Sequence, residues 1–192
     1  MSAAVTAPVV VLVGAPGAGK TTVGRQVAAR LGVSFRDTDT DVEAAAGKPI
    51  SDIFIDEGEQ PFRAREQAAV EDALRTHEGV LALGGGAVLS AETRALLRGH
   101  RVVQLEVDLS SATSRVGLNR DRPVLALNPR AVLKGLLEQR APLYREVAGA
   151  VVPTSRRSVE QVVDDVLAAL AAPTGLPRTP VRPFEHPLHR DR

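Results

Sequence analysis

The chain has 192 residues, of which 44% are hydrophobic and 24% are charged, so its composition predicts one domain with a packed core. The formal net charge of +1 argues against a basic face for nucleic acid. The absence of cysteine excludes disulfides and metal sites built on thiolates, and the four histidines lie in no spacing typical of a metal-binding helix.

The two ends of the chain have different expected roles, and neither is expected to enter a membrane. The N-terminal sequence MSAAVTAPVVVLVG has no basic residue before its apolar run, and the run is too short to span a bilayer. It therefore predicts a first strand in a cytoplasmic protein. Five prolines within residues 172–192 favour an extended, disordered Pro/Arg-rich tail, so the domain is assigned to residues 1–171.

The body alternates β-branched runs with helical patterns, which is typical of βαβ units and a parallel sheet. Strands are predicted at residues 8–13, 33–36, 80–83, 101–107 and 150–152. Helices are predicted at residues 20–31, 51–57, 61–77, 91–98, 110–116, 129–147 and 159–170. Residues 117–128 lack such a pattern and predict a mobile loop. His77 and His100, at element ends, are expected on the surface.

The strongest local signal is GAPGAGKT at residues 14–21, a complete G-x-x-x-x-G-K-T pattern between a predicted strand and a predicted helix. Glycines let successive backbone N–H groups converge on phosphate at a helix N-terminus. Lys20 would reach the β- and γ-phosphates, and the Thr21 hydroxyl would bind Mg²⁺. The flanking elements argue against a chance glycine-rich turn. The absence of D-x-x-G and N-K-x-D elements argues against a switch GTPase.

Two carboxylates, Asp37 and Asp39, follow the second predicted strand. On a strand, residues two apart face the same side, which at this edge of an open α/β sheet is the ligand crevice. Asp37 would then act on Mg²⁺ or its waters, and Asp39 would receive a substrate hydroxyl. The competing interpretation is that Asp39 only caps the helix that contains Val42.

Further charged and glycine-rich groups each allow two interpretations. Arg63 and Glu66 are i, i+3 neighbours on a predicted helix, where a solvated pair is the alternative to a functional one. Gly84–Gly86 permits a ligand to approach backbone N–H groups, or is a loose connector. Arg122 could act on transferring phosphate. Arg140 lies on a helix, where surface solvation is the alternative.

Together these motifs resemble those of the shikimate kinase family. The matching segments are GAPGAGKTT at 14–22, DTD at 37–39, DIF at 52–54, FRxxE at 62–66, GGGAV at 84–88, DRPxL at 121–125 and RAPLYRE at 140–146. The resemblance implies an α/β, three-layer P-loop kinase with a five-stranded parallel sheet, helices on both faces and a mobile lid at about residues 117–128. It also implies ATP-dependent phosphorylation of the 3-hydroxyl of shikimate, on the pathway to chorismate and the aromatic amino acids.

The resemblance further implies roles for individual residues. The catalytic residues would be Lys20, Asp39 and Arg122. The ATP site would comprise Gly17, Ala18, Gly19, Lys20, Thr21, Thr22, Arg115, Arg122 and Arg156. The shikimate site would comprise Asp39, Arg63, Gly84, Gly85, Gly86 and Arg140, with Glu66 orienting Arg63. Mg²⁺ would be held by Thr21 and, through water, by Asp37. A monomer with no membrane or nucleic-acid partner is expected.

Two positions depart from the family pattern, and two other functions compete with this one. Pro61 stands where a polar or acidic residue is expected and could tilt the substrate helix, and Val124 stands where leucine is common. Another small P-loop kinase, for gluconate or AMP, is disfavoured by DTD, FRxxE and GGG. A nucleotide-dependent regulatory protein without catalysis is disfavoured by the presence of Lys20, Thr21, Asp39 and Arg122.

Overall fold

The computed structural model describes residues 7–116 and 129–172. The expectations for a loop at 117–128, for Arg122 within it and for most of the tail therefore lie outside the described residues. The strands are β1 (Val10–Val13), β2 (Phe35–Asp37), β3 (Val80–Ala82), β4 (Val102–Glu106) and β5 (Ala150–Pro153). The helices are α1 (Lys20–Leu31), α2 (Thr38–Ala46), α3 (Ile50–Asp56), α4 (Glu59–Thr76), η1 (Ala87–Leu89), α5 (Ala91–Leu97), α6 (Leu109–Val116), α7 (Pro129–Val147) and α8 (Val159–Ala171).

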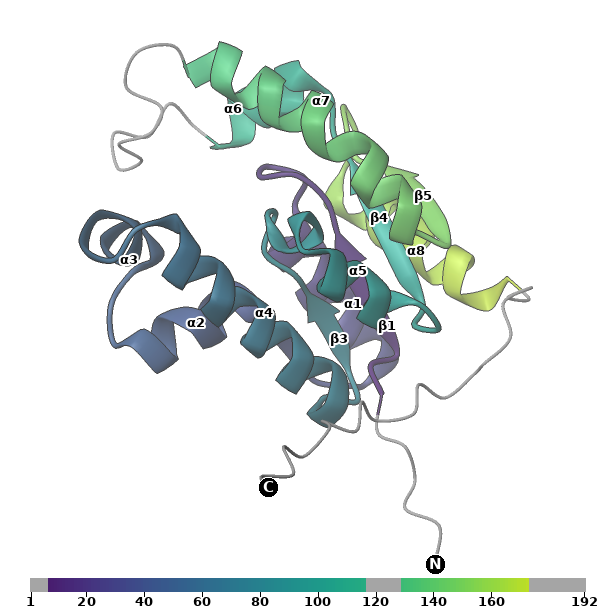
Figure 1. Cartoon of the computed structure of the whole chain (residues 1–192). Coiled ribbons are helices and arrows are strands. Elements are labelled where there is room, and N and C mark those ends of the chain that lie inside the picture. The colour runs from purple at the N-terminus through teal and green to yellow at the C-terminus, as the bar shows by residue number, and fades with distance from the viewer. Residues whose placement is uncertain (1–6, 117–128, 173–192) are drawn as a thin grey trace, which may run out of the picture.

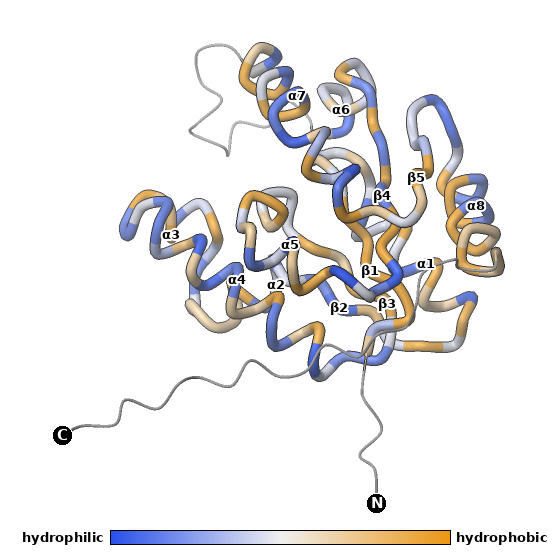
Figure 2. The backbone as a smooth tube through the Cα atoms, turned by 45° about the vertical axis from the view of Figure 1, so that its right-hand side comes forward, coloured by the Kyte–Doolittle hydropathy of each residue, from blue (hydrophilic) through white to orange (hydrophobic). Residues whose placement is uncertain are grey.

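The five strands form one parallel sheet in the order β2-β3-β1-β4-β5. The central strand β1 is fully buried, as its unbroken run of valine and leucine predicts for a strand covered on both faces. Helices α1 and α8 pack together on one face, and α4, α5 and α7 lie toward the other (Figure 1). This three-layer α/β architecture confirms the predicted fold class. Figure 2 shows the hydrophobic residues concentrated on the strands at its centre.

Helices α2, α3 and α4 enclose a second, smaller hydrophobic cluster. Val42, Ile53 and Phe62 are buried there, separately from the cluster around the sheet. The rings of Phe54 and Phe62 lie 4.5 Å apart between centroids. Pro61 lies in the first turn of α4, where backbone N–H groups have no intrahelical partner, so it breaks no helical hydrogen bond. This group of helices therefore has a core of its own.

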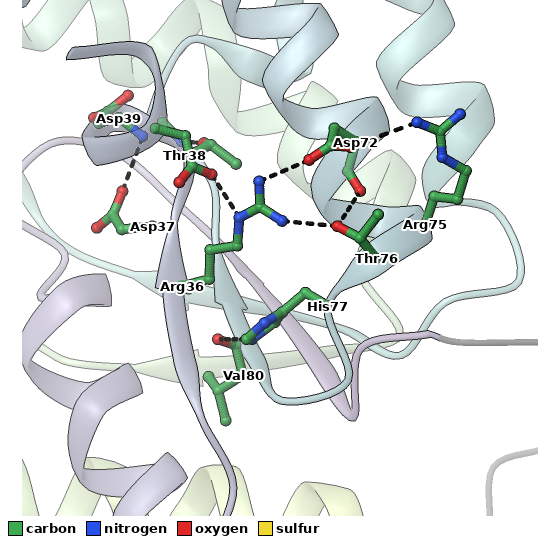
Figure 3. A network of polar contacts seen from close by, with 11 residues as sticks. Arg36, Asp37, Thr38, Asp39, Asp72, Arg75, Thr76, His77 and Val80 are labelled. Atoms are coloured by element: carbon green, nitrogen blue, oxygen red, sulfur yellow. Dashed lines mark hydrogen bonds and ion pairs between the residues drawn. The ribbon is translucent and has the colours of Figure 1, made fainter. Parts of the chain in front are cut away.

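Arg36 on β2 joins this helical group to the sheet (Figure 3). Its Nε donates to Asp41 on α2 at 2.7 Å, and its Nη2 and Nη1 donate to Asp72 and Thr76 on α4, both at 2.9 Å. The hydrogen bond from Arg36 holds the pKa of Asp72 below its usual value. One guanidinium thus fixes two helices against one strand.

The two histidines differ from the expectation that both are surface residues. His77 is buried, and its Nε2 lies 3.1 Å from the carbonyl oxygen of Val80, across the turn from α4 to β3 (Figure 3). His100 is half-buried, and burial lowers its pKa. The surface assignment is wrong for His77, because the return of the chain from α4 into the sheet encloses the ring.

Within the described residues, no helix combines the length and the apolar character needed to cross a bilayer.

Candidate active site

The turn between β1 and α1 has the geometry of a phosphate-binding loop. Gly14, Gly17 and Gly19 have φ values of 148°, 82° and 91°, which side chains rarely tolerate. A Cβ atom on Gly14 would also overlap the carbonyl oxygen of Leu105 on β4. The loop opens directly into the N-terminus of α1, which is 12 residues long and adds its dipole to the backbone N–H groups.

Two side chains of α1 lie at this turn. Lys20 directs its Nζ back over the loop, where it donates to the carbonyl oxygens of Gly14 (2.7 Å) and Ala15 (3.2 Å). Thr21 donates its hydroxyl to Asp37 Oδ2 at 2.8 Å. Hydroxyl and carboxylate oxygens are the ligands that Mg²⁺ prefers, so Thr21 and Asp37 fit that ion. In the described ranges no group of three or more His, Cys, Asp or Glu residues could hold a metal.

The structure corrects both interpretations of the Asp37–Asp39 segment. Strand β2 ends at Asp37, and Asp39 lies in the first turn of α2, so the two carboxylates do not share a strand face. Asp37 is the residue that caps α2, because its Oδ1 accepts the backbone N–H of Asp39 at 3.1 Å. The cap turns the chain so that Asp39 reaches the end of β3, where a Cβ atom on Gly84 would overlap its Oδ1.

Gly84–Gly86, directly after β3, is the point on which the surrounding elements converge. The Gly84 N–H donates to the buried Thr38 hydroxyl of α2 at 3.1 Å. A Cβ on Gly85 would lie 3.0 Å from Pro16 of the phosphate-binding loop, and one on Gly86 would overlap the guanidinium of Arg63. The loose-connector interpretation is therefore wrong, because each glycine lies against a different element.

Arg63 and Glu66 form a pair on α4 in which Glu66 is buried and Arg63 is partly buried, so the solvated-pair interpretation is also wrong. Arg63 Nη1 donates to Glu66 Oε2 at 2.6 Å, and Glu66 is only 3% exposed. Burial raises the pKa of Glu66, and the charge of Arg63 opposes that rise. The guanidinium carbon of Arg63 also lies 5.1 Å from the ring centre of Phe62 and 6.0 Å from that of Phe54. These contacts orient the side chain.

Helix α7 supplies Arg140 and Tyr144 from the opposite side. Arg140 is 9% exposed, which contradicts surface solvation, and its Nη1 donates to the carbonyl oxygen of Gly85 at 2.9 Å. Its Nε is buried and finds no acceptor in the part of the chain that the structure describes. Tyr144 donates its hydroxyl to the same Gly85 oxygen at 2.6 Å. No role was predicted for Tyr144, although its i, i+4 spacing from Arg140 in RAPLYRE places both on one helix face.

Two of the three arginines expected around ATP are described. Arg115 on α6 donates from Nη1 to the Thr154 hydroxyl (2.9 Å) and to the carbonyl oxygen of Gly17 (3.3 Å), so it connects the residue after β5 to the phosphate-binding loop. Arg156, in the turn after β5, has a φ of 56° and is the one non-glycine residue with positive φ in residues 7–116 and 129–172. Gly17, Ala18 and Gly19 lie in the loop itself, and Thr22 is exposed beside Thr21 on α1.

A hollow of about 450 Å³ borders this cluster on the side of α5. Arg63 and Glu66 form part of its wall, together with Glu59, Gln67 and residues of η1 and α5. Asp39, Gly84–Gly86 and Arg140 are not among its lining residues. Arg63 therefore lies against Gly86 and also forms part of the wall of an open hollow.

Comparison with known proteins points to one family. The family model described as shikimate kinase matches residues 16–171. The shikimate kinase of Salinispora tropica is 64% identical over 164 residues, which are 85% of this chain and 98% of the relative. That of Streptomyces coelicolor is 54% identical over 165 residues, 86% of this chain and 96% of the relative.

Solved structures agree. The shikimate kinase from Acinetobacter baumannii in complex with shikimate has a TM-score of 0.80 at 38% identity, and the match covers 84% of this chain and 91% of that one. A gluconokinase from Sinorhizobium meliloti has a TM-score of 0.54 at 22% identity, with 84% and 90% covered. The second likeness shows a common fold and nothing about the acceptor.

Proposed function

Because the chain belongs to the shikimate kinase family, it transfers a phosphoryl group from ATP to shikimate, and we propose that the residues around Gly84–Gly86 hold that acceptor. The observation that carries the proposal is the convergence of Asp39, Arg63 and Arg140 on these three glycines beside the phosphate-binding loop. The product would be shikimate 3-phosphate, on the pathway to chorismate and aromatic amino acids.

The carboxylate of shikimate would bind between Arg63 and Arg140. A guanidinium presents a rigid planar fork that matches a carboxylate, and two forks from different helices fix its orientation. Glu66 holds Arg63 in place through the 2.6 Å contact, and the Nε of Arg140 is a buried donor that a ligand oxygen would satisfy. The backbone N–H groups of the glycine run would add further donors.

Asp39 would orient the ring hydroxyls and receive the proton of the 3-hydroxyl. It lies at the first turn of α2 and against Gly84, on the same edge of the sheet as the phosphate-binding loop. Phosphoryl transfer needs the acceptor oxygen held in line with the γ-phosphoryl group, and the position of Asp39 on that edge supports this role. Lys20 would neutralise charge on the β- and γ-phosphates.

ATP would lie along the loop, with Arg115 and Arg156 flanking the adenine and Gly17–Thr22 contacting the phosphates. Thr21 and, through water, Asp37 would hold Mg²⁺. The ion supplies charge neutralisation on the phosphate oxygens. Arg122, outside the described residues, would stabilise charge on the transferring phosphoryl group, a role suited to arginine.

The enzyme would work as a monomer in the cytoplasm, without membrane or nucleic-acid partners. The near-neutral net charge of +1 supports the absence of a nucleic-acid partner.

One assay tests the function against its rivals. ADP release is measured in a coupled assay with shikimate, gluconate or AMP as acceptor, for the wild type and for Lys20→Ala. We expect the wild type to release ADP rapidly with shikimate and not with gluconate or AMP. Lys20→Ala should lose this activity and keep its circular dichroism spectrum, because Lys20 acts on phosphate and lies outside the core. Release that depends on gluconate or AMP would contradict the assigned acceptor, and absence of single-turnover transfer would indicate a binding protein.

A further inference from the structure

Arg63 is engaged by two carboxylates of very different exposure. Its Nη1 donates to the buried Glu66, as described, whereas its Nε and Nη2 both donate to Glu59 Oε1, at 3.3 and 3.2 Å. The side chain of Glu66 is 5% exposed and that of Glu59 is 64% exposed. One acid is fixed in the interior, and the other is held at the rim.

The contact with Glu59 uses the edge of the guanidinium that suits an incoming carboxylate. Nε and Nη2 form one of the forks through which arginine binds planar carboxylates in pairs of parallel hydrogen bonds. Here both donors converge on a single oxygen of Glu59, which stands one helical turn before Arg63. Nη1, on the other side of the guanidinium, is held by Glu66 and lies against Gly86, so Glu59 occupies the edge that remains for a second carboxylate.

We propose that Glu59 competes with the carboxylate of shikimate for Arg63 and is displaced into solvent when the substrate binds. The inference rests on the proposed function, in which Arg63 holds that carboxylate. Glu66 cannot play this part, since moving it would leave a buried charge without its partner. Glu59 is solvated already and borders the open hollow, so its release leaves no buried charge behind.

The strength of the Arg63–Glu59 ion pair sets the expected change in shikimate affinity. Exposed ion pairs are weak, and their usual range corresponds to a factor of about two to five in an equilibrium constant. Glu59 would therefore reduce shikimate affinity by about that factor. It would also speed the departure of the phosphorylated product, because the product carries the same carboxylate to Arg63.

The test compares Glu59→Gln with Glu57→Gln. Glu57 lies two residues away and binds Arg65 (2.9 Å) and Lys48 (3.0 Å), not Arg63, so its substitution removes the same charge without freeing the proposed anchor. The Kd of shikimate is measured by calorimetry at low and at high salt. We expect Glu59→Gln to lower Kd about two- to five-fold and Glu57→Gln to have a clearly smaller effect. The difference should shrink at high salt because the pair is screened.

A rise in Kd for Glu59→Gln would overturn the inference and show that Glu59 helps to position Arg63. Equal changes in the two variants would also overturn it, since a general charge effect would then suffice. Arg63→Ala separates this inference from the function on which it rests. If Arg63→Ala weakens shikimate binding and Glu59→Gln does not strengthen it, only the competition fails. If Arg63→Ala leaves binding unchanged, the proposed carboxylate site fails as well.

Discussion

Tyr144 and Arg140 donate to one and the same carbonyl oxygen, that of Gly85, at 2.6 and 2.9 Å. A carbonyl oxygen has two lone pairs, so these two donors saturate it. The two side chains stand one turn apart on α7 and together attach that helix to the turn after β3. The middle glycine of the run is therefore held from outside the segment that contains it.

Tyr144 gives a direct prediction for pH dependence. Burial raises its pKa to about 12 in the folded protein, from about 10 in an unfolded chain. A raised pKa favours the folded state while the group is protonated, so this stabilisation is complete below about pH 10 and is lost as the pH rises toward 12. The chain has one tyrosine and no tryptophan, so phenolate absorbance follows this residue alone. Phenolate formation near pH 10 with the fold intact would contradict the buried hydrogen bond.

Gly86→Ala is expected to impair shikimate binding and to leave the backbone of the glycine run in place. Its φ of −97° suits alanine, and the atom that the new Cβ would meet belongs to the guanidinium of Arg63, whose displacement would weaken its pair with the buried Glu66 and lower stability. We expect the KM for shikimate to rise about ten-fold or more, in line with the loss of one charged hydrogen-bonded anchor.

Gly135→Ala on α7 is the matched control for Gly86→Ala. A Cβ at Gly135 would meet nothing within 4 Å, so the helix should gain up to about 1 kcal/mol with unchanged kinetics. Chemical unfolding and steady-state kinetics measure both variants. An unchanged KM for shikimate together with a loss of stability in Gly86→Ala would show that the backbone, rather than Arg63, yields.

Arg63→Lys and Arg140→Lys should each weaken shikimate binding more than ATP binding. Lysine keeps the positive charge but not the planar fork. The loss of shikimate affinity therefore reports the geometry of the contact with the carboxylate rather than its charge. For Arg140, lysine also removes the buried Nε donor. Isothermal titration with shikimate and with a nonhydrolysable ATP analogue gives the two affinities, and equal losses for both ligands would mark these arginines as structural.

Arg36→Met should lower stability through the helices rather than through the sheet. It removes ion pairs with Asp41 and Asp72, whose side chains are partly exposed, so about 1 kcal/mol and a fall of about 2–4 °C in Tm are expected. Arg30→Met is the control, because the pair of Arg30 with Asp164 is more exposed. An equal fall in Tm for both variants would show that the Arg36 network contributes no more than a surface pair.

Arg122→Ala should lower kcat by roughly 10²–10³, at the lower edge of what arginine contributes to phosphoryl transfer. The Kd of shikimate should change by less than about three-fold, since the interaction is expected mainly in the transition state. Both quantities are measured on one preparation. A weaker Kd with unchanged kcat would assign Arg122 to substrate binding instead.

The sequence predicted those parts of the fold and site that depend on local chemistry. The run of valine and leucine in β1 and the G-x-x-x-x-G-K-T spacing each determine a local conformation, and both lie where they were predicted. The family motifs named the groups that meet at Gly84–Gly86. What they did not predict was how the chain brings those groups together.

Asp39 shows one reason why the sequence did not predict the geometry of the site. The period of a strand applied to Asp37 and Asp39 gave the wrong geometry, because a capping hydrogen bond ends the strand between them. Glu66, Tyr144 and His77 show another, since their burial results from elements distant in sequence and i, i+3 or i, i+4 spacing alone does not distinguish a buried face from a solvated one. Long-range packing determines the burial of each of these side chains.

The separation of the two hydrophobic clusters bears on how the molecule opens. Val42, Ile53 and Phe62 form a hydrophobic cluster that is distinct from the one built on β1, β3 and β4. Such units exchange their amide protons through openings of different free energy. Ile53 is the buried residue of α3 and packs only in the small cluster, so the backbone of α3 is expected to exchange its amide protons sooner than that of β1. The helix that carries Asp52 and Phe54 would then open locally while the turn before α1 keeps its structure.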